Sequence, residues 1–314
     1  MKGRDVARRP DVTLNQLRYF LEAATTLSMT QAAANLLVAQ SAVSAAVSQL
    51  ERQVGAQLFV RRRSKGLTLT AAGQQLLAHT RVVLAGLDEA LDAARGADDQ
   101  VRGTIRVACF VTLAPFLLAD LLGGLRQRHP DLEVDVVEVD ADGARDALRA
   151  GRVELALCYD FGLGDDVRCD PVVSVPPHVV LPAGHRLAGR RRVRLRDLAR
   201  ERFILLDLPR SREYFLGLHA AAGVDPVIGH RSQGYETVRA MVASGLGYSV
   251  LNARPRHDET YGGHRVVARP IADDVPALPF VVASLASYRS TARARAMAAA
   301  VHDVAPGLLN PAPL

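Results

Sequence analysis

Residues 39–51 read AQSAVSAAVSQLE, and this stretch decides how the first quarter of the chain folds. Val43, Val47 and Leu50 recur at helical spacing, so one face of the predicted helix is apolar. The other face carries hydroxyl, amide and methyl groups and has no charge before Glu51. Surface helices usually expose Lys and Glu instead. The stretch therefore predicts a helix whose exposed face is polar but uncharged.

Two further helices are predicted before this one. Apolar residues recur at helical spacing from Leu14 to Ala24. Ser28 and its two successors offer capping groups for a second helix over QAAANLL, residues 31–37. A short turn at Val38 and Ala39 then leads into the polar helix. Two helices joined by so tight a turn predict a helix-turn-helix.

A basic hairpin follows the third helix. Apolar pairs at 59–60 and at 67 and 69 suit two short strands, and the link between them, residues 61–66, reads RRRSKG. Residues 1–70 hold ten Lys and Arg against four Asp and Glu, whereas the rest of the chain holds 29 of each sign. The whole net charge of +6 thus lies in the first quarter. This asymmetry favours a nucleic-acid-binding module, with a merely solvated basic surface as the alternative.

The uncharged helix face suits the major groove of DNA, because base edges there offer donors, acceptors and thymine methyl groups. A carboxylate on that face would repel phosphate. We predict a recognition face made of Gln40, Ser41, Ser44, Ala45, Ser48 and Gln49. Nearby cations are expected to hold phosphates or to enter the minor groove, namely Arg52, Arg61, Arg62, Arg63 and Lys65. A tightly packed Ser/Ala helix is the alternative, and the basic hairpin decides against it.

A long helix is predicted after the hairpin. Thr70 is a plausible N-cap, and the helix would run to about residue 95. Its leucines are spaced as in a heptad seam: Leu77, Leu84, Leu87 and Leu91. We predict a dimerisation helix, the alternative being a helix packed on its own protein. Residues 95–100 are predicted to be a hinge.

The residues from 13 to 73 resemble the N-terminal module of LysR-type transcriptional regulators almost end to end. The matching landmarks are LRYF at 17–20, TQAA at 30–33, QSAVS at 40–44, LE at 50–51, LF at 58–59 and LT at 69–70. The resemblance adds Thr30 and Gln31, at a helix start, to the predicted DNA contacts. Many family members carry a basic residue where Ala45 stands and Ser where Ala39 stands, so base readout is expected to be tuned differently here.

From residue 103 onward strands and helices alternate, which predicts α/β structure with a mostly parallel sheet. A first set covers strands 104–109, 134–139 and 153–159 and helices 112–128 and 142–150. A second set covers strands 171–181, 203–206, 227–231 and 248–252 and helices 211–222 and 235–243. A late strand, 280–284, and the helix after it are predicted to return to the first set.

This region resembles the effector-binding domain of the same family, which is similar to a periplasmic solute-binding protein. The matching phrases are GRVELAL at 151–157, VLPAGHRLAG at 180–189 and ETVRAMVASGLGYSVLN at 236–252. The fold class implied is α+β and multidomain. Its parts are a winged helix-turn-helix over 1–70, a linker helix over 71–98 and a two-lobed α/β domain over 103–305. The first lobe covers 103–170 and 272–305, and the second covers 171–271.

Ligands of such domains bind where strands end and helices begin, in the cleft between the lobes. Candidate residues in these positions are Thr112, Tyr159, Asp160, Asp207, Ser211, Arg212, Tyr235, Glu236 and Thr237. Hydroxyl groups, helix N–H groups and Arg212 suit a carboxylate, while the acidic residues suit an amine. The sequence therefore predicts a carboxylate or amino-acid-like effector. A helix cap or a surface ion pair is the alternative for each residue.

The remaining patterns bear on other classes of protein. GxSxG, P-loop and HExxH motifs are absent from the sequence, so we predict no catalytic, metal or cofactor site. Cys109, Cys158 and Cys169 lack metal-ligand or disulfide spacing. Cys109 and Cys158 each end a strand-like run, so buried thiols are expected there, with a redox-sensing role as the alternative. The N-terminus resembles no export signal, which argues against a transport receptor and for the cytoplasm. The expected partners are promoter DNA, a small effector and further copies in a homodimer or homotetramer, with RNA polymerase left open and no membrane.

Overall fold

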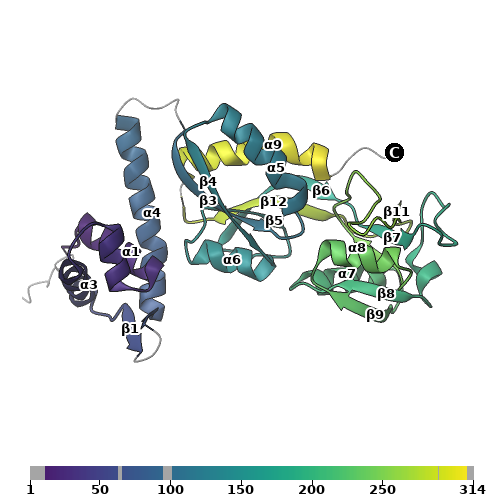
Figure 1. Ribbon diagram of the computed structural model, residues 1–314, viewed down its shortest axis with the longest axis horizontal. Coiled ribbons are helices and arrows are strands. Elements are labelled where there is room, and N and C mark those ends of the chain that lie inside the picture. The colour runs from purple at the N-terminus through teal and green to yellow at the C-terminus, as the bar shows by residue number, and fades with distance from the viewer. Residues whose placement is uncertain (1–10, 63–65, 95–100, 289, 310–314) are drawn as a thin grey trace, which may run out of the picture. The chain divides into compact units, whose positions relative to one another are not determined.

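The computed structural model describes residues 11–62, 66–94, 101–288 and 290–309. The chain divides into two compact units (Figure 1). One holds residues 1–99 with 149–152, and the other holds 100–148 with 153–314.

Three helices open the N-terminal unit, as the sequence predicts: α1 (Leu14–Thr26), α2 (Met29–Asn35) and α3 (Gln40–Val54). Thr13 caps α1 through a reciprocal capping box with Gln16. Ser28 caps α2, because its hydroxyl accepts a hydrogen bond from the backbone N–H of Gln31. Gly55 ends α3 with a left-handed φ of 73°. The predicted helix-turn-helix is thus confirmed.

The predicted hairpin is also present. Strands β1 (Phe59–Arg62) and β2 (Gly66–Leu69) pair antiparallel, with Phe59 opposite Leu69. The Glu51 carboxylate on α3 holds the entry to the hairpin, since its Oε1 accepts hydrogen bonds from the backbone N–H groups of Leu58 (2.8 Å) and Phe59 (3.2 Å). Of the predicted phosphate contacts, Arg63 and Lys65 lie outside the described residues, as do the side chains of Arg61 and Arg62.

The helix α4 (Ala71–Ala94) follows, and Thr70 caps it as predicted: the Gly73 N–H donates to the Thr70 hydroxyl at 2.9 Å. The same hydroxyl donates to the Gln57 carbonyl at 2.7 Å, so it ties α4 to the start of the hairpin. The first turns of α4 belong to the core of this unit, because Leu77 packs there with Phe20, Val47 and Leu50.

Lobe I of the second unit is built on one sheet, in the order β4-β3-β5-β12-β6. Its first three strands are parallel: β3 (Gly103–Phe110), β4 (Leu132–Val139) and β5 (Leu155–Tyr159). The late strand β12 (Leu278–Leu285) returns to this sheet, as predicted, and runs antiparallel to β5 and to β6 (Val167–Val175). In Figure 1, α5 (Ala114–Arg128) and α9 (Ala292–Leu309) lie on one side of the sheet and α6 (Ala141–Arg149) on the other.

Lobe II has two small sheets. One has the order β10-β7-β11, from β7 (His178–Pro182), β10 (Ser249–Leu251) and β11 (Val266–Pro270), and its pairs are antiparallel. The other pairs β8 (Arg202–Leu206) with β9 (Val227–Ser232) in parallel. A bridge between Phe203 and Tyr248 links the two sheets. The helices of the lobe are α7 (Ser211–Ala221), α8 (Tyr235–Ala243) and the short η1 (Leu195–Leu198).

The structure differs from the sequence prediction at the crossing between the lobes. The sequence assigns 171–181 to one strand of the second lobe. In the structure, Pro171 and the residues up to Val175 belong to β6, which pairs with β12 in the sheet of lobe I. The chain then passes Pro176 and Pro177 and enters β7. Two consecutive prolines lack N–H donors for either ladder, which explains the break.

No single helix in the described ranges is long and apolar enough to cross a membrane. By length and composition only α2 and α3 pass such a test as a pair, and they are bent by 114°.

Candidate DNA-reading surface and effector cavity

The helix α3 turns one face into the protein and the other outward. Val43, Val47 and Leu50 are buried in the core of the N-terminal unit. Most of the predicted recognition residues are exposed on the remaining surface: Gln40, Ser41, Ala45, Ser48 and Gln49. Ser44 is half-buried, and its hydroxyl accepts a hydrogen bond from the Gln40 amide at 3.0 Å. Arg52, also exposed, lies in the last turn of α3.

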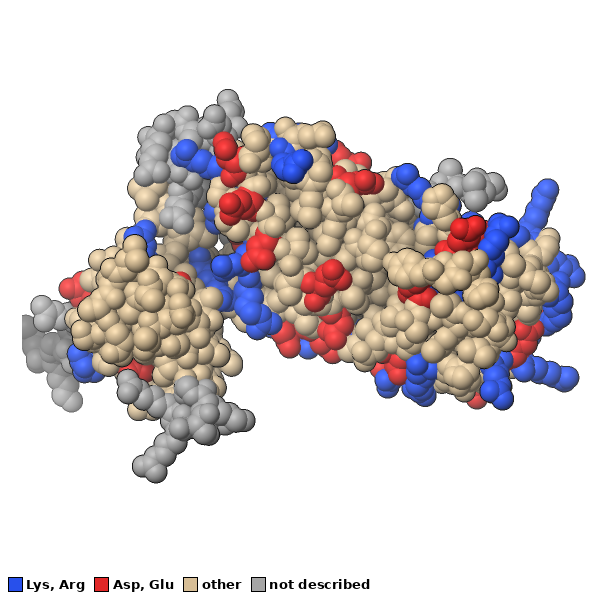
Figure 2. Space-filling model, viewed as in Figure 1, with Lys and Arg blue, Asp and Glu red and all other residues tan. Residues whose placement is uncertain are grey.

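A groove of about 300 Å³ separates α3 from the hairpin. Ser44 and Ser48 line its helix side, while Val60 and Leu67 line its hairpin side. Glu51, the one acidic residue of α3, also lies here and is bound to the hairpin backbone. The exposed polar face of α3 is therefore free of carboxylates. In Figure 2 most of the described surface of the N-terminal unit on the visible side is tan, that is, uncharged.

Thr30 and Gln31 are exposed at the start of α2. The Gln31 amide donates to Asn35 at 2.9 Å, and the Asn35 amide donates to Glu22 on α1 at 2.6 Å. The Gln31 side chain is thus held in place by hydrogen bonds within the N-terminal unit. Leu37, in the turn before α3, combines a left-handed φ of 55° with 92% exposure, which is unusual for a leucine.

The leucines predicted for dimerisation differ in their surroundings along α4. Leu77 is a core residue of the N-terminal unit and Leu84 is buried, while Leu87 is half-buried. Leu91 is 43% exposed, and Val83, on the same helix, is 50% exposed. Val83, Leu87 and Leu91 are four residues apart, so they form an apolar stripe on the second half of the helix.

In the second unit a cavity lies between the lobes. Four of the candidate effector residues meet there: Thr112, Tyr159, Ser211 and Tyr235. Thr112 follows strand β3 and Tyr159 ends strand β5 of lobe I, whereas Ser211 and Tyr235 begin helices α7 and α8 of lobe II. The free volume is only about 10 Å³, about the room that one water molecule takes. The structure therefore shows closely apposed lobes.

The other five candidates do not line this cavity. The Asp207 carboxylate binds Arg212 at 2.5 Å and Arg231 at 3.5 Å. The hydrogen bond from Arg212 is the main cause that lowers the pKa of Asp207 below its ordinary value.

The Glu236 carboxylate binds Arg239 at 2.6 Å and accepts the Tyr261 N–H at 2.8 Å. Asp160 accepts the Gly162 N–H at 3.0 Å, and Thr237 is exposed. The charged candidates are thus bound to partners within the protein.

Most residues of the cavity wall are not among the candidates predicted from the sequence. The residues outside that prediction are Phe110, Phe161, Leu206, Phe215, Asn252, Ala253 and Leu278. The chain has eight Phe, seven Tyr and no Trp. In the described part of the chain, seven of these rings line the cavity or touch a ring that does: Phe110, Phe116, Tyr159, Phe161, Tyr214, Phe215 and Tyr235. The clustering arises only on folding, because these rings are dispersed in sequence over both lobes.

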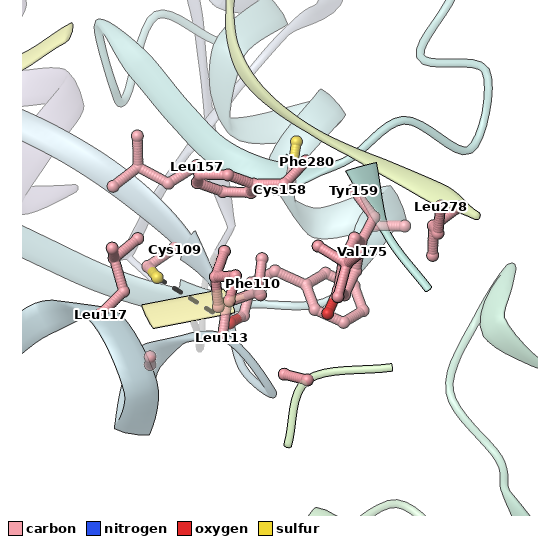
Figure 3. Close-up of a cluster of buried hydrophobic side chains, with 14 of the residues drawn as sticks. Cys109, Phe110, Leu113, Leu117, Leu157, Cys158, Tyr159, Val175, Leu278 and Phe280 are labelled. Carbon is pink, nitrogen blue, oxygen red and sulfur yellow. Dashed lines mark hydrogen bonds between the residues drawn. The ribbon is translucent and has the colours of Figure 1, made fainter. Parts of the chain in front are cut away.

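Figure 3 shows two of these rings, Phe110 and Tyr159, within the apolar cluster of lobe I. Their centroids are 5.5 Å apart, in an edge-to-face arrangement. Burial raises the pKa of the Tyr159 hydroxyl well above its ordinary value. The hydroxyl of Tyr235 donates to the backbone oxygen of Ala253. The cavity wall is therefore mostly apolar, and the residues that line it are uncharged at neutral pH.

Comparison with known proteins gives two family matches. The model of the bacterial regulatory helix-turn-helix protein, lysR family, matches residues 14–74, and that of the LysR substrate binding domain matches residues 98–306. A probable hydrogen peroxide-inducible genes activator from Streptomyces viridosporus is 30% identical over 94% of this chain and 95% of its own length.

Solved structures agree with these matches. HinK, a LysR family transcriptional regulator from Pseudomonas aeruginosa, is 34% identical with a TM-score of 0.63, over 93% of this chain and 98% of its own. A full-length OxyR variant from Pseudomonas aeruginosa is 27% identical with a TM-score of 0.76, over 93% and 97%. The chain therefore belongs to the LysR family, and it is a DNA-binding transcriptional regulator with a helix-turn-helix and an effector-binding domain rather than an enzyme.

Proposed function

We propose that α3 lies in the major groove of promoter DNA and reads base edges with Gln40, Ser41, Ser44, Ala45, Ser48 and Gln49. The observation that carries this proposal is the exposed row of hydrogen-bonding side chains on a helix whose opposite face is locked into the core. The orientation of Glu51 toward the hairpin supports it, because no carboxylate then faces the phosphates. Thr30, Gln31, Arg52, Arg61, Arg62, Arg63 and Lys65 would hold the DNA backbone.

The proposed assembly is a homodimer or homotetramer in the cytoplasm, with RNA polymerase as a further contact. Dimers would form through α4. The seam predicted from the sequence includes Leu77, but this residue packs in the core of the N-terminal unit, so the proposed seam consists of Leu84, Leu87 and Leu91. The apolar stripe of exposed Val83, half-buried Leu87 and exposed Leu91 supports this, since apolar side chains at helical spacing gain by facing a second helix. A two-fold dimer would read an operator with matching dyad symmetry.

The proposed effector site is the cavity between the lobes, where Thr112, Tyr159, Ser211 and Tyr235 converge. The carboxylate or amino-acid-like effector remains a prediction from the sequence alone. The residues assigned to it that lie outside the cavity are Asp160, Asp207, Arg212, Glu236 and Thr237. An effector changes DNA binding only as far as it prefers the DNA-bound state. The relative position of the two lobes is the variable on which it would act.

The proposed groove contacts are tested by footprinting, that is, by measuring which bases upstream of the protein's own gene the bound protein protects from cleavage. The assay uses competitor DNA and physiological salt. Gln40→Ala is expected to relax the base preference within the protected dyad by about 1–3 kcal/mol at one position. Binding to unrelated DNA should stay as it is, because the amide would read a base and not a phosphate.

Gln74→Ala is the matched control, since Gln74 is an exposed glutamine on α4. It should leave both base preference and affinity unchanged. If Gln40→Ala kept the base preference of the wild type, Gln40 would not contribute to base recognition, and other residues would have to provide the sequence specificity.

The name of the Streptomyces viridosporus relative raises a second candidate, a response to hydrogen peroxide. The thiolate is the form of cysteine that peroxide oxidises. Cys109 and Cys158 are fully buried, and burial raises the pKa of the Cys109 thiol to about 12. Burial also raises the pKa of Cys158 and of the half-buried Cys169. At neutral pH these three thiols are therefore protonated.

We expect DNA binding by the reduced protein to be insensitive to a brief molar excess of hydrogen peroxide. The measurement is promoter affinity before and after treatment, with thiol titration alongside. Cys169→Ser, at the most accessible of the three positions, should behave as the wild type. A peroxide-dependent change in affinity that Cys169→Ser abolishes would instead establish the redox response.

A further inference from the structure

The wall between the lobes is made of rings that contact each other across the cleft. Phe161 of lobe I meets Tyr214 of lobe II with centroids 6.0 Å apart. Phe116 on α5 meets Tyr235 on α8 at 5.5 Å, edge to face. Such pairs are the arrangement that ring quadrupoles favour. The two lobes are thus held together at the cavity by aromatic contacts.

The polar groups of the cavity are few and neutral. Thr112, Ser211 and Asn252 line it, and each is buried. The Asn252 amide nitrogen donates to the Val175 carbonyl and to the Tyr214 hydroxyl, each at 3.0 Å, so its side chain can offer a ligand only its acceptor oxygen. None of the residues that line the cavity in the described chain carries a formal charge.

Charged groups lie near the cavity but are bound to each other. Asp207 is held by two arginines, and Glu236 is held by Arg239. Arg210, on the lobe II side, reaches Asp142 on α6 of lobe I at 3.2 Å. A charged ligand would have to break one of these pairs or enter an uncharged site without a counterion, and the second costs several kcal/mol per ion.

We propose that the effector of this protein is an uncharged molecule that carries an aromatic ring and a single hydroxyl or similar hydrogen-bonding group. This rests on the proposed effector site, and it replaces the carboxylate or amino-acid-like ligand that the sequence predicts for that site. The ring takes the place between the lobes that the Phe161–Tyr214 and Phe116–Tyr235 contacts occupy in the closed structure. The polar group binds Thr112, Ser211 or the Asn252 oxygen.

The closed cavity has room for about one water molecule, so the ligand enters only when the lobes move apart. The connections that allow this are the two crossings of the chain between the lobes, at Pro176–Pro177 and between β11 and β12. A bound ring then replaces one direct contact across the cleft with two ring–ligand contacts. Binding thereby sets the separation of the two lobes. This separation is the structural change through which the ligand would alter DNA binding.

The test is isothermal titration of the full-length protein with four probes that each carry one six-membered ring. They are benzyl alcohol, cyclohexylmethanol, benzoate and L-phenylalanine. We expect benzyl alcohol to bind at least tenfold more tightly than each of the others. Phe161→Leu, which removes a ring and keeps an apolar side chain, should weaken binding of benzyl alcohol at least tenfold. Tyr261→Leu is the matched control, because Tyr261 is 91% exposed and lies outside the cavity.

Equal affinity for cyclohexylmethanol would overturn the requirement for an aromatic ring. Tighter binding of benzoate or L-phenylalanine, lost in Arg212→Gln, would overturn the uncharged class and restore the carboxylate prediction. Binding of none of the four at millimolar concentration would overturn the proposal as well. Promoter protection without any probe tests the proposed function separately. Benzyl alcohol that binds without changing promoter affinity would leave the ligand class standing and remove the role of this site in DNA binding.

Discussion

Gly73→Ala is expected to abolish specific DNA binding. A Cβ added to Gly73 would lie 2.1 Å from the carbonyl oxygen of Leu58 and 2.9 Å from Cδ2 of Leu69. The first of these neighbours is backbone at the entry of the hairpin, and this backbone is held by Glu51 and by Thr70. Helix α4 must therefore move away from the hairpin. Overpacking of this kind costs about 3 kcal/mol, a large part of the stability of a small domain.

The measurement is promoter affinity by fluorescence anisotropy, with thermal unfolding followed by circular dichroism. Gly86→Ala is the control on the same helix, since an added Cβ there meets no atom within 4 Å. It should stabilise α4 by up to about 1 kcal/mol, because alanine favours a helix over glycine. Gly73→Ala with wild-type affinity would show that the contact between α4 and the hairpin is not needed for DNA binding.

Acid is expected to destabilise the effector-binding unit from just below neutral pH. His178, at the start of β7, is buried, and burial lowers the pKa of its imidazole from 6.5 to about 3, with the Arg254 charge as the next cause. Burial also lowers the pKa of His219, whose ring nitrogens bond to the Phe215 carbonyl and the Tyr248 hydroxyl. Both imidazoles are thus neutral in the folded state.

The sign follows from proton uptake. Well above pH 6.5 the imidazole of His178 is neutral in both the folded and the unfolded state, so it adds no pH dependence there. Below pH 6.5 His178 becomes protonated in the unfolded chain, but in the folded protein it stays neutral down to about pH 3. The free energy of unfolding therefore decreases as the pH falls from 6.5 to about 3. Between pH 6.5 and 4.5 the loss from His178 is about 2 kcal/mol. His219 adds to it in the same direction.

The measurement is urea unfolding of the full chain at pH 6.5, 5.5 and 4.5, followed by far-ultraviolet circular dichroism. His178→Gln should flatten the dependence in this window, because glutamine does not titrate. His257→Gln, at an exposed position, is the control and should keep the wild-type slope. Equal slopes for the wild type and His178→Gln would show that folded His178 takes up its proton as readily as the unfolded chain does.

The sequence alone determined the parts of the fold that depend on local patterning. The spacing of Val43, Val47 and Leu50 defines which side of α3 is buried, and the same periodicity leaves the polar side exposed. The caps at Ser28 and Thr70 and the two strands beside RRRSKG are also local signals, since each involves residues within a few positions of one another. The helices and most strands of both lobes follow from the same kind of pattern. The prediction is wrong for 171–181, which divides into β6 and β7, it lacks β11, and it gives a mostly parallel sheet where most strand pairs of this unit are antiparallel.

Only the tertiary structure decided the composition of the effector cavity. Phe110, Phe161 and Phe215 come from three distant segments, and no local period links them. The ion pairs are equally non-local: Asp207 pairs with Arg231, and Arg210 pairs with Asp142. From the sequence, a charged side chain at the end of a strand is predicted to contact a ligand. The tertiary structure shows instead that such a side chain pairs with an opposite charge from a distant segment. Periodicity reports which side of an element is buried, while the neighbours that neutralise a charge or stack on a ring are set by how distant elements pack.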